Sequence, residues 1–177
     1  RMVDESPCMA GVMDSQEVRV SCTTKLSSAD IPETVFAALQ NIFPDVTPDG
    51  LDFQNNRFPN LKGEITWSFS DLDLEHFLHK IHQDRVLDTA LDAMSQKLEG
   101  KKTTFELSRQ AAINGKISFC LLGENPLGGT FIISLQCEYL KAWLQEATWH
   151  RGREDVPREI GDETAMKKDG RIREWFD

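Results

Sequence analysis

The chain has 177 residues, 40% of them hydrophobic, and a formal net charge of −9 from 29 acidic and 20 basic residues. This length is sufficient for one substantial core, so the composition predicts one domain with terminal extensions. The acid excess argues against broad electrostatic capture of nucleic acid, because that affinity depends on neutralising phosphates. It leaves room for a local basic site.

Neither membrane insertion nor a disulfide framework is indicated by the sequence. No run approaches the ~18 consecutive apolar residues of a spanning helix, and residues 1–16 lack the apolar centre of a secretory signal. We therefore expect a cytoplasmic protein that does not contact membranes. The cysteines show no CxxC spacing, which predicts buried free thiols rather than a metal site: Cys8, Cys22, Cys120 and Cys137.

Hydrophobic periodicity divides the chain into three parts. Residues 1–16 show no sustained pattern and predict a flexible leader, whereas residues 17–150 carry the regular patterns of a single folded domain. After His150 the sequence mixes acidic and basic residues with few large apolar ones. Residues 151–177 therefore predict a charged tail.

The first half of the domain predicts strands that alternate with helices. Period-two alternation predicts strands at 17–23, at 51–53 and over 61–69. Helical spacing predicts one helix between Asp30 and Pro44, with Asp30 and Glu33 as a capping box. It predicts two more over 71–83, opened by Ser70, and over 85–99, stopped by Gly100.

Residues 101–123 form a block whose charge runs against that of the whole chain. Alternation predicts a strand over 103–107, after which Ser108 caps a short helix over 109–113 that Gly115 stops. Further alternation predicts strands over 116–122 and 130–137, joined by a turn-forming loop, and a final helix over 138–149. We expect those last two strands to pair as an antiparallel hairpin.

This order of elements implies an α+β fold, with an antiparallel or mixed sheet and helices packed mainly on one face. The strand over 130–137 is rich in Phe, Ile and Leu and contains no Lys or Pro. We expect it at a sheet edge, where it would invite a two-fold homodimer. The competing expectation is that Trp175 and Phe176 dock back and cover this surface within one chain.

Three stretches resemble an archaeal uncharacterised protein family that is predicted to bind RNA, with a fold like that of the large-subunit ribosomal protein L-five. They are ETVFAALQNIFPD (33–45), RVLDTAL (85–91) and TTFELSRQAAINGKISF (103–119) followed by ENPLGG. The resemblance covers about residues 17–149 and implies an α+β domain that pairs as a homodimer. It supplies no functional residues, so the RNA association that it implies rests on fold alone. The leader and the charged tail depart from the family's usual shape.

The basic block provides a candidate nucleic-acid surface. Its cations would neutralise phosphates, while its amides would read base edges or the ribose hydroxyl. The candidate residues are Lys101, Lys102, Arg109, Gln110, Asn114 and Lys116. The alternative is an ordinary solvated patch, which the lack of an exposed aromatic platform favours.

A histidine-rich helix is the second candidate site. Glu75, His79 and His82 share one side of the predicted helix, beside His76, but a metal site would need a further ligand from elsewhere. A polar stripe that faces solvent or a dimer partner is the favoured interpretation, so we assign no metal ligand.

Catalytic motifs are lacking in the sequence. It contains no GxSxG, P-loop or GxGxxG pattern, so we expect no enzyme activity, no cofactor and no small-molecule substrate. Two functions remain. One is a non-catalytic binding module that associates with RNA, and the other is a homodimeric protein-interaction domain without RNA affinity. The acid excess favours the second and the family resemblance favours the first.

Overall fold

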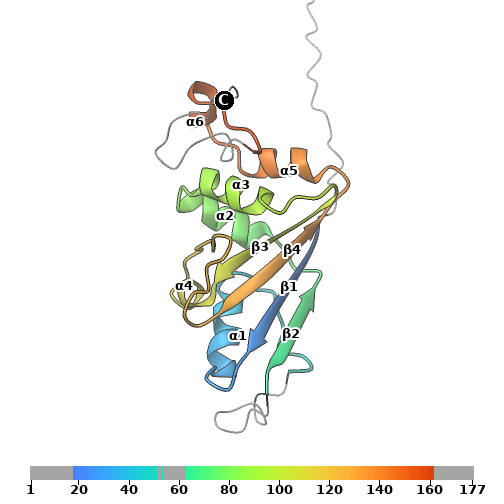
Figure 1. The fold of residues 1–177 in the computed structure, drawn as a ribbon, viewed down its shortest axis with the longest axis vertical. Coiled ribbons are helices and arrows are strands. Elements are labelled where there is room, and N and C mark those ends of the chain that lie inside the picture. The colour runs from blue at the N-terminus through green and yellow to red at the C-terminus, as the bar shows by residue number, and fades with distance from the viewer. Residues whose placement is uncertain (1–17, 52, 54–62, 162–177) are drawn as a thin grey trace, which may run out of the picture.

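Four strands form one antiparallel sheet in the computed structural model, which describes residues 18–51, 53 and 63–161. The strands are β1 (Arg19–Leu26), β2 (Ile65–Ser70), β3 (Lys102–Ser108) and β4 (Thr130–Gln136). Their order across the sheet is β2-β1-β4-β3, so β1 and β4 are central (Figure 1). The expected α+β fold with an antiparallel sheet is confirmed.

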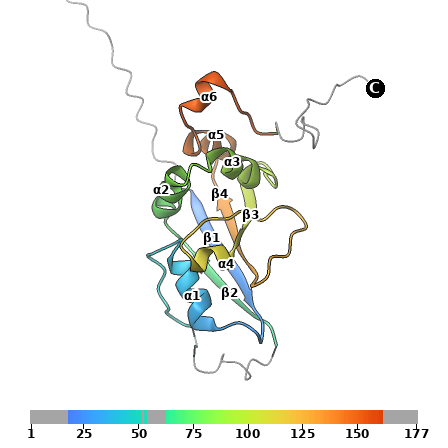
Figure 2. The same cartoon turned by 90° about the vertical axis from the view of Figure 1, so that its left-hand side faces the viewer.

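The described residues contain six helices, most of them on one face of the sheet. In Figure 1 helices α1 to α4 lie to the left of the strands, and Figure 2, viewed from that side, shows them in front of the strands. The helices are α1 (Pro32–Gln40), α2 (Glu75–Gln83), α3 (Leu87–Ser95), α4 (Arg109–Ile113), α5 (Leu140–Ala147) and α6 (Gly152–Asp155). None of them is long and apolar enough to span a membrane.

The core lies between these helices and the sheet. Alternate strand residues are buried, as period-two patterning predicts. Phe77 of α2 stands at the centre, with ring centroids of Phe43, Phe105 and Phe119 at 5.9 to 6.5 Å. The largest fully buried strand residues are Leu26, Leu107, Phe131, Ile133 and Leu135. The strand positions between the buried ones are mostly polar and face away from the helices.

The expected hairpin of 116–122 with 130–137 is wrong. Residues 116–122 form no regular strand, and they contact the sheet through an isolated bridge between Phe119 and Leu107 on β3. β4 pairs instead with β1 and with β3, because its inward face meets apolar residues of both strands. β4 therefore has no free edge, and the expectation that it lies at a sheet edge is wrong.

Several local expectations also change. The predicted capping box at Asp30 is wrong, since α1 has Ile31 at its N-cap and no side-chain cap. The helix expected from residue 71 begins only at Glu75, because Asp71 takes a positive φ of 55°. No strand forms at Leu51 and Phe53, which pack against the core instead; residue 52 lies outside the described residues.

Three of the four cysteines lie among the described residues, two of them in the core. Cys22 and Cys137 are buried thiols, and Cys120 is a half-buried one. Burial raises the pKa of Cys22 to about 12, so this thiol stays protonated at neutral pH. The proposed leader, Cys8, and residues 162–177 with Trp175 and Phe176 lie outside the described residues.

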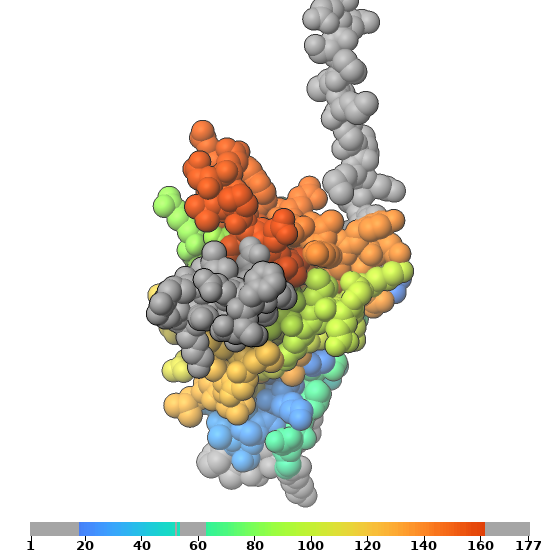
Figure 3. Space-filling view, turned by 45° about the horizontal axis from the view of Figure 1, so that its top comes forward, coloured from blue at the N-terminus to red at the C-terminus, as the bar shows by residue number. Residues whose placement is uncertain are grey.

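The residues just after α5 are attached to α3 by a charged network. Arg153 of α6 is 8% exposed and its Nε donates to Asp88 Oδ1 at 3.1 Å, while His150 Nε2 lies 3.1 Å from Asp88 Oδ2. Figure 3 turns this end of the molecule towards the reader, with residues 138–161 in orange and red. Burial alone would raise the pKa of Asp88, but hydrogen bonds and positive charge from His150 and Arg153 outweigh it and lower that pKa.

We predict that Asp88→Asn lowers the free energy of unfolding at pH 7 by about 1 kcal/mol, a modest figure because surface ion pairs are screened by water. Asp88 has a lower pKa folded than its ordinary 3.8, so its contribution is present above that value and is lost as pH falls through the folded pKa. Urea unfolding at pH 7 and pH 3 should show the difference between variant and wild type shrinking at pH 3. Asp49→Asn, at an exposed loop position, is the matched control. A difference that persists unchanged at pH 3 contradicts the assignment.

Candidate nucleic-acid interface

The structure separates the six residues of the predicted basic surface into two groups. Lys101 and Lys102 stand at the start of β3, and the other four follow its end. A seven-residue strand is roughly 20 Å long, so the two groups do not form one patch. Lys101 is also engaged with Glu138, since Nζ lies 2.6 Å from its carboxylate. Gln110, Asn114 and Lys116 are exposed around α4.

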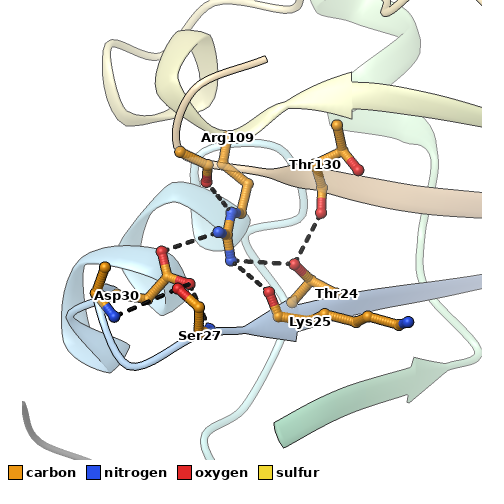
Figure 4. Close-up of polar contacts among 8 residues, drawn as sticks. Thr24, Lys25, Ser27, Asp30, Arg109 and Thr130 are labelled. Carbon is orange, nitrogen blue, oxygen red and sulfur yellow. Dashed lines mark hydrogen bonds and ion pairs between the residues drawn. The ribbon is translucent and has the colours of Figure 1, made fainter. Parts of the chain in front are cut away.

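Arg109 is not a surface residue, contrary to the sequence-based expectation. Its side chain is 5% exposed and the guanidinium is surrounded by acceptors from three segments (Figure 4). Nη2 donates to Asp30 Oδ1 at 2.9 Å, and Nη1 donates to Lys25 O at 3.1 Å and to Thr24 Oγ1 at 3.4 Å. Nε donates to the carbonyl oxygen of Gly128. Buried charge of this kind is stable only when paired and hydrogen-bonded, so Arg109 is a structural residue.

The partners of Arg109 are themselves fixed. Asp30 accepts a second hydrogen bond from the backbone N–H of Ser27 at 2.7 Å, and Thr24 Oγ1 donates to Thr130 O at 2.8 Å. A Cβ on Gly129 would lie 2.3 Å from Arg109 Nη2, so glycine is needed for the guanidinium to pass. We call Arg109 and the four residues that its guanidinium contacts, Thr24, Lys25, Asp30 and Gly128, the Arg109 hub. The hub joins the end of β1, the start of α1 and the loop before β4.

The short helix that carries Arg109 forms as the sequence predicts. Ser108 Oγ accepts a hydrogen bond from the N–H of Ala111, and Gly115 has a φ of +67°, which glycine adopts without steric cost. Asn41, the C-cap of α1, donates through Nδ2 to Ala112 O at 2.9 Å, which fixes α4 on α1. The Ser108 cap, the Gly115 stop and the Asn41 contact together hold α4, and with it Arg109, in place.

The sheet face opposite the helices is a second, polar surface that the sequence analysis did not identify. Strand register aligns its side chains in transverse rows. One row crosses all four strands and carries hydroxyls: Ser70, Ser21, Ser134 and Thr104. The neighbouring row crosses three strands and ends in a cation at each side: Arg19, Gln136 and Lys102. We call these the hydroxyl row and the cationic row, and the surface that holds them the open face.

The charge on the open face is opposite to that of the chain. The strands contribute three cations, Arg19, Lys25 and Lys102, and one carboxylate, Glu106. That carboxylate is engaged, because Oε1 lies 3.6 Å from Lys97 Nζ and Oε2 accepts from Thr130 Oγ1 at 3.1 Å. The face is therefore net positive within a chain of net charge −9.

The side chains of the hydroxyl row are available to a ligand. Within the described part of the chain, no side-chain hydrogen bond involves Ser21, Ser70, Thr104 or Ser134, whose side chains are exposed or half-buried. A signal was present in the sequence, since polar residues alternate with the apolar ones in each strand. The rows themselves need the strand register, which no local pattern supplies.

The histidines of α2 do not converge. His76 and His79 are exposed, while His82 Nε2 lies 2.9 Å from Ala147 O of α5 and links the two helices. Among the residues that the structure describes, no three His, Cys, Asp or Glu side chains come together to hold a metal ion. His82 therefore joins α2 to α5.

An apolar groove lies beside the Arg109 hub, between α1, α4 and the loop that precedes β4. Its volume is about 300 Å³. Three large apolar side chains at its border are exposed, at 59% for Ile31, 48% for Ile113 and 86% for Leu127. Exposed apolar side chains gathered in this way are typical of protein contact sites.

The fold and the open face define an α+β protein that presents one exposed polar sheet face. No protein-family model matches the chain. In sequence it is similar to archaeal UPF0201 proteins. It is 28% identical over 140 residues to that of Metallosphaera sedula, covering 76% of this chain and 92% of that protein, and 39% identical over 80 residues to that of Sulfurisphaera tokodaii. A UPF0200/UPF0201 protein of Archaeoglobus fulgidus is 27% identical over 106 residues, or 60% of this chain. The chain spans only 29% of the Archaeoglobus protein and 55% of the Sulfurisphaera protein.

Solved structures agree on the fold. The UPF0201 protein of Methanococcus jannaschii superposes with a TM-score of 0.60 at 18% identity, over 76% of this chain and 96% of that protein. An uncharacterized UPF0201 protein gives 0.55 at 21% identity, over 72% and 90%. At these identities the likeness concerns the fold alone.

We predict that Arg109→Ala lowers the free energy of unfolding by about 3 to 5 kcal/mol, because it leaves the largely buried Asp30 without its partner. Arg109→Lys should also destabilise, since one ammonium cannot reach acceptors on three segments. Lys116→Glu, at an exposed position, is the control and should change stability by no more than ~0.5 kcal/mol. Urea unfolding measures all three, and an Arg109→Ala variant as stable as wild type contradicts the structural role.

We predict that Gly129→Ala destabilises the protein by about 1 to 3 kcal/mol, since its φ is +79° and the new Cβ meets the guanidinium. The cost should be smaller in an Arg109→Ala background, where the steric conflict is gone and the backbone strain remains. A double-mutant cycle by urea unfolding gives this coupling. Additive effects would show that the two residues do not interact.

Proposed function

We propose that this protein is a non-catalytic binding module that associates with RNA through its open face. The observation that carries the proposal is the pairing of the cationic row with the hydroxyl row on one exposed surface. Arg and Lys neutralise phosphates, and Ser, Thr and Gln side chains hydrogen-bond to phosphate oxygens and sugars. The two rows hold all of these residue types side by side.

The charge distribution supports the same surface. A polyanion is repelled by a chain with 29 acidic residues and attracted by the part of it that is net positive. Lys102 belongs both to the predicted basic block and to the cationic row, so the proposal keeps one residue of that block and moves the interface from α4 to the sheet. The resemblance to a family predicted to bind RNA, with an L-five-like fold, is a further argument by analogy.

Charge reversals at the two ends of the cationic row test this proposal. We expect Arg19→Glu with Lys102→Glu to weaken binding to total RNA at least about tenfold, and to reduce the salt dependence by about 0.7 to 0.9 for each phosphate that is no longer neutralised. Filter binding at about 50 and 200 mM salt measures both quantities. Arg85→Glu with Lys116→Glu is the control, because it makes the same charge change at exposed positions off the open face.

Comparison of the two double variants decides between the open face and the surface around α4. Equal losses in both double variants would show that net charge alone governs binding. A loss confined to the control would return the interface to α4. A wild-type chain without RNA affinity even at low salt refutes RNA association. Thermal unfolding of each variant verifies that the fold is intact.

The second candidate function is a homodimeric protein-interaction domain, and the apolar groove is the observation that favours it. Ile31, Ile113 and Leu127 expose apolar surface that a second copy would bury. One patch used twice about a two-fold axis satisfies both copies. This contact takes the place of the one expected at β4 from the sequence, because β4 pairs with β1 on one side and with β3 on the other.

We predict that the wild-type chain is a dimer and that Ile113→Asp with Leu127→Asp makes it a monomer. Charged side chains at these positions would have to lose water on association. Light scattering at micromolar concentration measures the mass. Val156→Asp, at an exposed apolar position on the other end of the molecule, is the control and should remain dimeric. A monomeric wild type refutes this candidate without affecting RNA association.

A further inference from the structure

We infer that the open face recognises double-helical RNA, by contact with ribose 2′-hydroxyls, in preference to single-stranded RNA or DNA. This inference rests on the proposed RNA association and specifies its ligand. It follows from three properties of the face: which side chains it lacks, which it carries and how large it is.

Stacking side chains are missing from the open face. Single-stranded RNA is usually held by aromatic rings on which unstacked bases lie. The strands contain four aromatic residues, and register places all of them on the side that faces the helices: Trp67, Phe69, Phe105 and Phe131. Ile132 is the one large apolar side chain that these strands present on the open face. Splayed bases would therefore find no ring to stack on.

The hydroxyl row has the hydrogen-bonding chemistry of its proposed target. A serine or threonine hydroxyl donates one hydrogen bond and accepts others, and so does a ribose 2′-hydroxyl. In an A-form helix the wide, shallow minor groove displays the 2′-hydroxyls on its surface. DNA lacks this group, so contacts from Ser21, Ser134 and Thr104 would be made by RNA only.

The dimensions of the open face suit a groove surface better than a single strand. Neighbouring strands lie about 4.8 Å apart, so the hydroxyl row is roughly 14 Å wide. The cationic row runs parallel to it, two residues further along the strands, or about 7 Å away. Cations at one border and hydroxyls beyond them match a phosphate backbone followed by exposed riboses.

The test is a set of titrations with four probes of one sequence: an RNA duplex of about 16 base pairs, long enough to offer two successive minor grooves, the DNA duplex, the single-stranded RNA and a 2′-O-methyl RNA duplex. We expect the RNA duplex to bind at least about tenfold more tightly than the other three. DNA lacks the 2′-hydroxyl, 2′-O-methylation removes its donor hydrogen, and single-stranded RNA does not hold its riboses in the regular array of a minor groove. Replacing Ser21, Thr104 and Ser134 together by Ala should lower the affinity of the RNA duplex to that of the DNA duplex and leave DNA binding unchanged. Ser28, Thr47 and Thr89, exposed hydroxyls elsewhere, give the control triple variant.

The outcomes separate this inference from the proposal on which it rests. If single-stranded RNA or DNA binds as tightly as the RNA duplex, the inference is overturned, while charge-dependent RNA association stands. If the hydroxyl triple variant binds the RNA duplex like the control triple variant, the hydroxyl row does not recognise the ribose 2′-hydroxyls. If no RNA probe binds at about 50 mM salt, both the inference and the proposed function are wrong.

Discussion

The buried guanidinium of Arg109 is the interaction on which the arrangement of this protein depends. A charge that is 5% exposed is tolerated because four acceptors, one of them a carboxylate, surround it. These acceptors come from β1, the start of α1 and the loop before β4, so one side chain ties the helical layer to the two central strands. Thr24 adds a direct link, since its hydroxyl donates to the carbonyl of Thr130. The register of β1 against β4 is thereby held at one end.

That register determines the open face. A slip of one residue between two strands would move each side chain to the opposite face. In the observed register, Ser21 lies beside Ser134 and Arg19 beside Gln136. The apolar residues at alternate positions meet the helices, and the polar ones gather into rows. The Arg109 hub thus contributes to the proposed RNA surface through strand register, since its guanidinium contacts none of the residues of the two rows.

The same topology changes the basis for assembly. A strand as apolar as β4 would invite pairing if it lay at an edge. It lies between β1 and β3, where both of its backbone edges are hydrogen-bonded. The exposed apolar surface is found instead at the groove beside α1 and α4, on the helical side of the molecule. The proposed RNA surface and the candidate dimer contact therefore occupy opposite sides of the sheet, so a dimer contact at the groove would leave the open face exposed.

The sequence by itself determined the features that depend on neighbouring residues. Period-two alternation identified the buried faces of β1, β2, β3 and β4, and Ser108 with Gly115 marked the limits of α4. Strand order, register and the burial of Arg109 were decided only by the tertiary structure. Arg109 meets partners as far as 85 residues away, and no local pattern reports such acceptors. The predicted basic surface shares only Lys102 with the open face. The reason is that charge counted along a chain does not say on which side of a sheet, or at which end of a strand, each side chain will stand.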